Sequence, residues 1–284
     1  MNLFKKSLKP SWTFPRSPEN SNKKIWRLLP GSGILAVELR DVDKKEVEFA
    51  GIDLNTGAPL WQNLQLEEKW WVNINKIYQD VLLLQQFVRP DMPQPGKIFA
   101  VDIFTGKILW QDEAVEFLNA ADGRVYGIRR TFQSEEVIGL NPKTGEAEIA
   151  LSVDDPRSRV LNNVFEPEEY SLPVPLEEAE ETRHGDVANV AHVFPAGAKS
   201  PTIIKSSSGK EVAGYHVQSG TDGKGIQTFD SLIKIADPDG KVIFEDRADS
   251  GVYTTLQDFY FVVNEELIYV RNSNEVVAVK LDDK

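Results

Sequence analysis

The sequence predicts an all-β protein, a β-propeller of five or six four-stranded blades whose last blade is closed by an N-terminal strand. Three observations support this prediction. An eleven-residue motif recurs along the chain, its copies are spaced at about the length of one blade, and the last copy is incomplete. The chain has 284 residues, which is enough for one large domain with a substantial core.

The motif is clearest in residues 51–61 and 100–110, which read Gly-Ile-Asp-Leu-Asn-Thr-Gly-Ala-Pro-Leu-Trp and Ala-Val-Asp-Ile-Phe-Thr-Gly-Lys-Ile-Leu-Trp. The positions that coincide without a gap are Asp53/Asp102, Thr56/Thr105, Gly57/Gly106, Leu60/Leu109 and Trp61/Trp110. Weaker copies keep some of these positions, with Asn141, Thr144 and Gly145 in the third and Asp237, Gly240 and Phe244 in the fourth. Such repetition is typical of folds whose units stack on one another.

Each copy has the chemistry of a β-hairpin. An alternating apolar run such as residues 47–52 predicts a strand. The Thr-Gly pair that follows closes a tight turn, because glycine tolerates the positive φ that the turn requires. The Asp or Asn three residues before Thr accepts a backbone N–H and fixes the turn. The second strand ends in Trp, a large ring suited to packing against the next sheet.

The spacing of the turn glycines indicates the architecture. Gly106 follows Gly57 by 49 residues and Gly145 follows Gly106 by 39, against about 40–50 residues for a propeller blade. Four strands are expected inside the second interval, over residues 113–121, 124–131, 135–140 and 146–153. Gly240 lies 95 residues beyond Gly145, an interval that holds either two blades or one blade with a large insertion.

The two ends of the chain are expected to complete the ring. The last strand pattern, residues 275–281, stops where a further copy would need its turn and its Trp strand. The triplet Lys24-Ile25-Trp26 resembles Ile108-Leu109-Trp110, so we expect Trp26 to lie on a strand that covers the open edge of the last blade. Residues 23–284 then form a single propeller domain with an irregular segment at about 152–229, and residues 1–22 form a basic, flexible leader.

The motif at residues 100–110 resembles the repeat of the quinoprotein-like (PQQ-like) β-propeller families, and in particular a short bacterial branch of unknown function. The resemblance implies the propeller fold. Quinone-dependent enzymes with this repeat place the quinone beneath vicinal cysteines and beside a calcium ion. Because the present chain has no cysteine, we expect no cofactor.

Composition narrows the classes of partner. The formal net charge is −12 and the pI is near 4.9, which argues against nucleic acid or an anionic membrane as the main partner. The absence of cysteine excludes disulfides, thiolate-bound zinc, iron–sulfur clusters and cysteine nucleophiles. No apolar stretch has the length of a secretory signal or a membrane span. We therefore expect a soluble, cytoplasmic monomer.

The chain has three histidines, two of which are candidate metal ligands together with one aspartate. His184, Asp186 and His192 lie close together in the sequence, and imidazole and carboxylate groups suit zinc or iron. No helix or hairpin pattern sets them at a ligand spacing, so we expect no metal site there. His216 falls in a predicted strand, where a role in packing between blades or at the surface is expected.

Two irregular stretches and one aromatic pair are also distinctive. A Pro-rich acidic stretch contains Glu166, Glu168, Glu169, Glu177, Glu178, Glu180 and Glu181, and is interpreted as a solvated excursion from the repeat. Residues 219–225 are rich in glycine but lack the rest of a phosphate-binding loop, which indicates a hairpin connection. Trp70 and Trp71 are assigned to core packing, on the view that a strand presents them to opposite faces.

The repeat is explained by folding alone, so the predicted function is that of a non-catalytic platform that binds a protein or a small ligand at one face of the ring. An alternative is a hydrolase or lyase with acidic residues at the mouth of the central channel, and a third reading is a propeller that binds a small molecule or metal ion. Residues 152–229 interrupt the period and are expected to form part of the partner surface, with a basic or metal-bearing partner.

Overall fold

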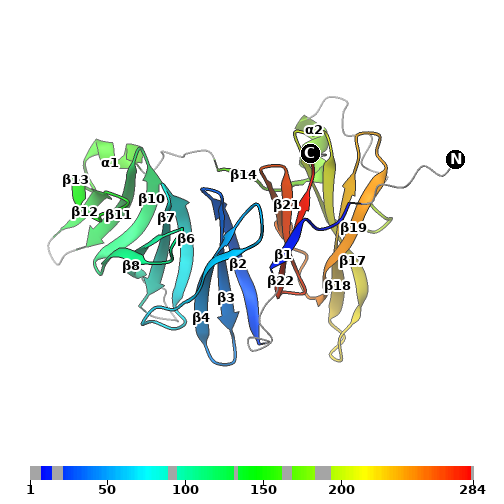
Figure 1. Cartoon of the computed structure of the whole chain (residues 1–284), viewed down its shortest axis with the longest axis horizontal. Coiled ribbons are helices and arrows are strands. Elements are labelled where there is room, and N and C mark those ends of the chain that lie inside the picture. The colour runs from blue at the N-terminus through cyan, green and yellow to red at the C-terminus, as the bar shows by residue number, and fades with distance from the viewer. Residues whose placement is uncertain are drawn as a thin grey trace. The chain divides into compact units, whose positions relative to one another are not determined.

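The computed structural model describes residues 8–14, 22–88, 95–130, 134–161, 168–182 and 193–282. These residues form five antiparallel sheets of four or five strands and two short helices (Figure 1). In each sheet consecutive strands pair as in a propeller blade, so the predicted all-β fold class is confirmed. No helix in these ranges is long and apolar enough to cross a bilayer.

The chain divides into two compact units. The three-sheet unit comprises residues 20–168, and the two-sheet unit comprises residues 1–19 and 169–284. The single domain expected over residues 23–284, and the number of blades, stay predictions.

The three-sheet unit contains three four-stranded meanders in chain order (Figure 1). The first consists of β2 (Lys23–Gly31), β3 (Ile34–Asp41), β4 (Glu46–Asp53) and β5 (Pro59–Leu64). The second consists of β6 (Val72–Tyr78), β7 (Val81–Phe87), β8 (Pro95–Asp102) and β9 (Ile108–Asp112). The third consists of β10 (Val115–Ala121), β11 (Arg124–Arg130), β12 (Glu135–Leu140) and β13 (Ala147–Ser152), followed by α1 (Pro156–Leu161). The first strands of neighbouring sheets are adjacent, since β6 contacts both β2 and β10.

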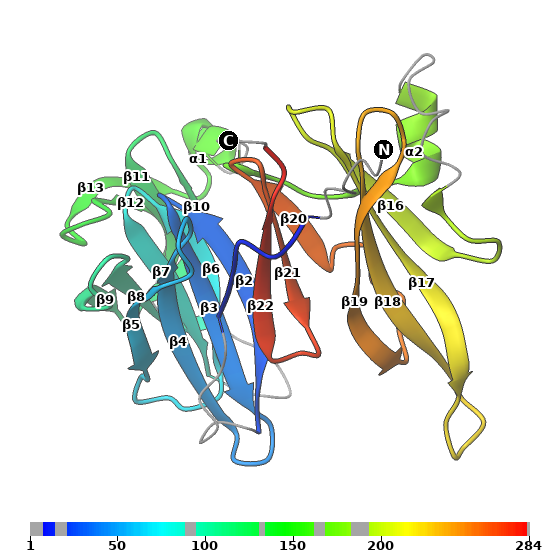
Figure 2. The ribbon, with the colours of Figure 1, turned by 45° about the vertical axis from the view of Figure 1, so that its right-hand side comes forward.

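The two-sheet unit contains two five-stranded sheets. One has the order β15 (Val174–Pro175), β16 (Lys199–Lys205), β17 (Glu211–Thr221), β18 (Gln227–Ala236) and β19 (Val242–Val252). The other has the order β1 (Trp12–Phe14), β22 (Glu275–Lys280), β21 (Glu266–Arg271), β20 (Tyr260–Val263) and β14 (Tyr170–Ser171). Helix α2 (Leu176–Thr182) follows β15. The glycine-rich stretch closes the long β17–β18 hairpin (Figure 2).

An N-terminal strand does complete the last sheet, but it is not the strand that the sequence indicated. Strand β1 pairs with β22, with Trp12 opposite Ala278 and Phe14 opposite Val276. Both aromatic side chains are buried. Trp26 instead lies in β2, which pairs with β3. The assignment of Trp26 to the closing strand was therefore wrong, and the strand that closes the sheet falls within residues 1–22, which were expected to be a leader.

The repeated motif forms the turn between the third and fourth strands of each sheet in the three-sheet unit, and its weaker fourth copy forms the β18–β19 turn. The Asp53 carboxylate accepts hydrogen bonds from Thr56 N at 2.9 Å and Thr56 Oγ1 at 2.7 Å. Asp102 does the same for Thr105, and Asn141 Oδ1 accepts from Thr144 N at 3.1 Å. In the weaker fourth copy, Gly240 N donates to Asp237 O at 2.8 Å, and Phe244 is buried in the core of the two-sheet unit.

The glycines and tryptophans of the motif meet between neighbouring sheets. Gly57, Gly106 and Gly145 all have φ near +70°, at 71°, 69° and 73°. Trp61 packs on Gly106 and donates from Nε1 to Ile103 O at 2.6 Å, and Trp110 packs on Gly145. Each Trp thus fastens its own sheet to the turn of the next one, which explains why the Thr-Gly turn and the Trp recur together.

The long interval between Gly145 and Gly240 holds one sheet and an insertion. Residues 199–236 form the regular strands β16, β17 and β18, whereas residues 153–198 contain only the two short helices and the two-residue strands β14 and β15 among the described residues. The four strands expected within residues 113–153 correspond to β10–β13.

A β-bulge recurs in the first strand of all three sheets of the three-sheet unit. The register shifts between Ile25 and Arg27 in β2, between Ile74 and Lys76 in β6, and between Phe117 and Asn119 in β10. The extra residues are Trp26, Asn75 and Leu118. A bulge bends the strand and redirects the side chain of the unpaired residue.

Candidate functional site

Strand β2 presents an exposed tryptophan at its bulge. Ile25 pairs with Leu39 and Arg27 pairs with Glu38, so Trp26 has no partner on β3, and its side chain is 60% exposed. Lys24 and Arg27 are also exposed, whereas no residue of β6 or β10 is exposed. Among the first strands of this unit, β2 is therefore the one with exposed residues in the described part of the chain.

Arg40 of β3 holds the exposed ring in place. Its Nε donates to Glu38 Oε1 at 2.6 Å, Nη1 donates to Trp70 O at 3.0 Å, and Nη2 donates to Val72 O at 2.7 Å. With its guanidinium fixed in this way, Cζ lies 5.6 Å from the ring centroid of Trp26 and 4.9 Å from that of Trp70. These are cation–π distances. We call Trp26, Arg40 and Trp70 the aromatic site.

Glu38 is the buried anchor of the aromatic site. It is only 1% exposed, and besides binding Arg40 it accepts a hydrogen bond from Ile74 N on the next sheet at 3.1 Å. Arg27 strengthens the same junction, since its Nη1 donates to Ile74 O at 2.7 Å. Removal of one member of such a buried ion pair typically costs about 3–5 kcal/mol. The site is therefore rigid because it is built into the contact between two sheets.

The assignment of Trp70 and Trp71 to the core was wrong. They lie in the bent connection between β5 and β6, not in a strand, and both are only half-buried. Glu68 Oε1 accepts hydrogen bonds from Trp70 N at 2.8 Å and Trp71 N at 2.9 Å, which sets the bend. The bend carries the Trp70 ring over Arg40, with Lys45 Nζ 6.0 Å from its centroid.

The charges exposed on β2 and on the β3–β4 turn, beside the aromatic site, are mainly positive, and the bend that carries Trp70 adds one exposed charge of each sign, Glu67 and Lys69. The exposed charged residues of β2 and of the β3–β4 turn are Lys24, Arg27, Asp43, Lys44 and Lys45. The acidic groups close by are buried and occupied: Glu38 binds Arg40, Glu48 binds Lys23, and Asp41 accepts from the backbone N–H groups of the β3–β4 turn. A ligand would thus meet an aromatic ring bordered by cations.

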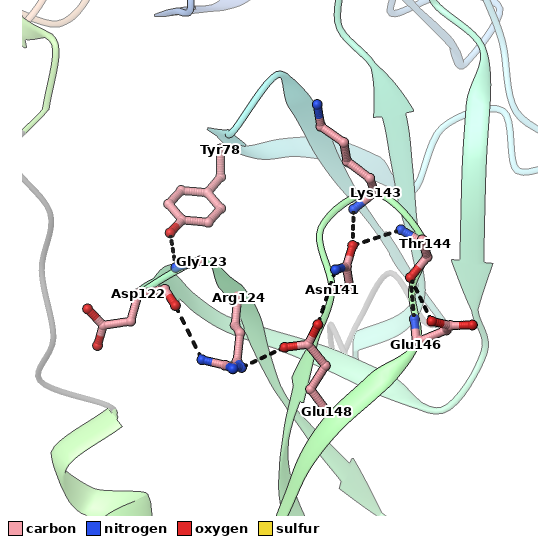
Figure 3. Close-up of polar contacts among 9 residues, drawn as sticks. All are labelled: Tyr78, Asp122, Gly123, Arg124, Asn141, Lys143, Thr144, Glu146 and Glu148. Atoms are coloured by element: carbon pink, nitrogen blue, oxygen red, sulfur yellow. Dashed lines mark hydrogen bonds and ion pairs between the residues drawn. The ribbon is translucent and has the colours of Figure 1, made fainter.

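A second polar cluster joins Tyr78, at the end of β6, to the β10–β11 and β12–β13 turns of the next sheet (Figure 3). The Tyr78 hydroxyl accepts from Gly123 N at 2.7 Å, Arg124 Nε lies 2.9 Å from Glu148 Oε2, and Asn141 Nδ2 donates to Glu148 Oε1 at 3.1 Å. These contacts join residues of the cluster to one another. They hold the turns together, and this structural role explains why the residues are present. The remaining labelled side chains belong to the same turns, and they are Asp122, Lys143, Thr144 and Glu146.

The histidine candidates fall in different places. His184, Asp186 and His192 lie outside the described residues. His216 is 1% exposed, its Nε2 lies 2.7 Å from Leu256 O, and its Nδ1 lies 3.0 Å from Ser231 Oγ. Because a carbonyl only accepts, Nε2 carries the proton and Nδ1 accepts from Ser231. Burial lowers the pKa of His216, so it is a neutral packing residue. Within the described ranges, no three His, Asp or Glu side chains are placed to hold a metal ion.

Glu38 and Arg40 were missed by the sequence reasoning. The available signal is that two charged residues two positions apart interrupt the apolar strand that begins at Ile34. Residues two apart on a strand share a face, so such a pair inside a strand buried on both faces indicates an internal ion pair.

Comparisons with known proteins add a family match and distant structural likenesses. A family model described as "Domain of unknown function (DUF4905)" matches residues 29–110, which cover most of the first two sheets. No curated protein sequence matches the chain significantly.

Solved structures similar to the chain include a europium-containing methanol dehydrogenase, with 14% identity and a TM-score of 0.33 over 92% of this chain and 47% of that chain. The Dos1 propeller is 10% identical, with a TM-score of 0.29 over 92% and 68% of the two chains. A member of the duf4221 family from Bacteroides vulgatus is 11% identical, with a TM-score of 0.20 over 97% and 98%. The chain thus spans about half the length of the methanol dehydrogenase.

Proposed function

We propose that this protein is a non-catalytic binding protein and that the aromatic site is its contact surface. The observation that carries the proposal is the exposure of Trp26, which is 60% accessible while its ring is stacked on an arginine fixed by three hydrogen bonds. Folding alone does not require a large aromatic ring in water at this position.

The physical chemistry of the site suits binding. Tryptophan and arginine dominate the energetics of protein interfaces, because they bury a large area and make directed polar contacts. A side chain that is already ordered loses less conformational entropy when a partner binds. Arg40 and the bulge already order Trp26 in the free protein. Less of the free energy gained when a ligand stacks on the ring is therefore lost to ordering the side chain.

The alternative function, a hydrolase or lyase, would need carboxylates free to act as acid and base. The buried carboxylates beside the aromatic site are engaged with Arg40 and Lys23, which favours binding over catalysis at this place. We propose no cofactor, and the monomeric state and the cytoplasmic location stay predictions. Kinship with the PQQ-like propellers remains our interpretation of the repeat.

The proposal is tested by site-specific photocross-linking in cells that express the protein natively. A photoreactive phenylalanine analogue replaces Trp26 in one variant and Leu109 in a matched control. Leu109 is an exposed apolar residue, 41% accessible, on the outer strand β9 of the same unit. We expect discrete cross-linked species from position 26 and none from position 109. Equal cross-linking from both positions, or none from position 26, would refute the proposal.

A further inference from the structure

One segment of the chain already adds strands to the first strands of both sheets in the two-sheet unit. In β14, Tyr170 and Ser171 pair with Val263 and Val262 of β20. In β15, Val174 and Pro175 pair with Ile203 and Thr202 of β16. These two strands make the sheets five-stranded instead of four-stranded. The edge of a first strand in this protein therefore accepts an extended segment.

The composition of this segment is specific. We call residues 168–178 the acidic segment, which reads Glu-Glu-Tyr-Ser-Leu-Pro-Val-Pro-Leu-Glu-Glu. Prolines at alternate positions, 173 and 175, remove the N–H groups from one side of the extended chain, and the N–H groups of residues 172 and 174 remain on the other side. Such a chain can pair with one sheet edge and resists further pairing.

The first strands of the three-sheet unit carry no added strand in the part of the chain that the structure describes. Strand β2 is the first strand of its sheet and pairs there only with β3, and among the three first strands it is the one with exposed residues, namely Lys24, Trp26 and Arg27. An edge of this kind presents N–H and C=O groups to a partner, and an extended peptide that pairs with it gains main-chain hydrogen bonds.

The charges around β2 indicate an acidic partner. Lys24, Arg27, Lys44 and Lys45 are exposed there against Asp43. Arg40 already occupies one face of Trp26, so a second cation on this ring would be repelled. Within the same unit, Lys76 of β6 forms an ion pair with Glu168 at 3.6 Å. A residue of the acidic segment thus already contacts a lysine of the neighbouring first strand.

Resting on the proposed function, we propose that β2 accepts an extended acidic peptide of a partner protein as an added strand. One apolar side chain of the peptide covers the free face of Trp26, and its carboxylates pair with Lys24 and Arg27. An acidic sugar would satisfy the ring and the charges but would make no use of the strand edge. Strands β14 and β15 show that first strands of this protein pair with an extended segment, and this favours a peptide over a sugar as the ligand.

The test measures fluorescence anisotropy with a labelled synthetic peptide of residues 168–178 and the full-length protein. We expect saturable binding that weakens severalfold between 50 and about 300 mM salt, because exposed charges are screened. A control peptide with Gln at all four Glu positions should bind at least about fivefold more weakly. A third peptide, N-methylated at residues 172 and 174, should lose binding because it cannot donate to a strand edge.

Two variants locate the site. Trp26→Ala should weaken binding of the peptide by roughly tenfold or more, as for an interface hot spot, and Leu109→Ala should leave binding within about twofold. Unfolding curves that show both variants to be fully folded under the binding conditions exclude loss of fold as the cause. Binding that Trp26→Ala leaves unchanged, or undiminished binding of the N-methylated peptide, would overturn the inference.

Two further outcomes separate this inference from the proposed function. An oligogalacturonate that binds through Trp26 while the peptide does not would replace the peptide by an acidic sugar and overturn the inference. Absence of peptide binding together with specific cross-linking from position 26 would also overturn the inference, and it would leave the proposed function standing.

Discussion

The indole ring of Trp110 lies against the backbone of Gly145 in the next sheet. A Cβ atom on Gly145 would lie 2.8 Å from Cδ2 of Trp110, and Trp110 Nε1 donates to Pro142 O at 2.7 Å. The same relationship joins Trp61 to Gly106, where a Cβ would lie 2.7 Å from Cδ2 of Trp61. A glycine is thus required at this turn for two reasons: its backbone has a positive φ, and the ring packs where a Cβ atom would lie.

Gly106→Ala should therefore lower the free energy of unfolding by more than the strain of a positive φ alone would explain. Gly33→Ala is the matched control, because Gly33 has φ +74° and no atom within 4 Å of the added Cβ. We expect about 1–2 kcal/mol of destabilisation for Gly33→Ala and about 1–3 kcal/mol more for Gly106→Ala, from overpacking against Trp61. Urea unfolding measures both free energies, and equal costs would show that the Trp61 contact is not tight.

Truncating the packed tryptophan should also destabilise the protein, because the turn glycine loses the ring that packs on it. Trp110→Ala removes a half-buried ring and its hydrogen bond, so we expect a loss of about 2–4 kcal/mol, somewhat below the value for a fully buried ring. Trp26→Ala, at an exposed ring, should cost only about 0.5–1 kcal/mol, mostly from the lost cation–π contact. Similar losses from urea unfolding of the two variants would contradict the assignment of one ring to packing and the other to binding.

His216 should make stability dependent on pH below its ordinary pKa. Burial lowers the folded-state pKa beneath the ordinary value of 6.5. As the pH falls through 6.5, the unfolded chain takes up a proton before the folded chain does, so the free energy of unfolding decreases until the folded pKa is reached. Above pH 6.5 this residue contributes no pH dependence.

The measurement compares the native chain with His216→Gln by urea unfolding at pH values from 5 to 8. The other two histidines are present in both proteins, so the difference isolates His216. We expect the native chain to lose more stability than the variant between pH 6.5 and 5. Parallel curves would show that His216 is not held neutral by burial.

Strand β1 should be needed for the stability of the last sheet. Phe14 is 6% exposed and pairs with Val276, so Phe14→Ala should cost about 2–4 kcal/mol. Thr13→Ala, at the half-buried residue between the two aromatic rings, is the matched control and should cost less than about 1 kcal/mol. Equal, small effects in thermal unfolding would mean that β22 does not depend on this strand.

The parts of the fold that could be predicted from the sequence are those set by neighbouring residues. The Asp53–Thr56 turn involves residues three apart, so its chemistry is visible in the sequence, and the Trp that follows marks the next contact. Strand β1 escaped detection because three residues are too few to show an alternating pattern. Trp26 was misassigned because the triplet around it resembles that of Trp110, and only the pairing partner distinguishes the two strands.

The aromatic site could not be predicted because its members meet only in the folded chain. Trp26, Arg40 and Trp70 are brought together by the register of β2 on β3, by the bulge that turns Trp26 outward, and by the bend that Glu68 caps. A shift of one residue in that register would send Arg40 to the other face of the sheet. Local sequence carries no information about such a register, although the charged pair Glu38 and Arg40 marks the strand as unusual.

The most direct test of the binding role of β2 is amide hydrogen exchange of the full-length protein with and without a saturating concentration of the 168–178 peptide. The account predicts slower exchange in residues 23–29, where the added strand would cover the edge, and unchanged exchange in the outer strand β9 at residues 108–112. Unchanged exchange in β2, or slowing that appears in β9 instead, would contradict the claim that this edge and its exposed tryptophan form the binding surface.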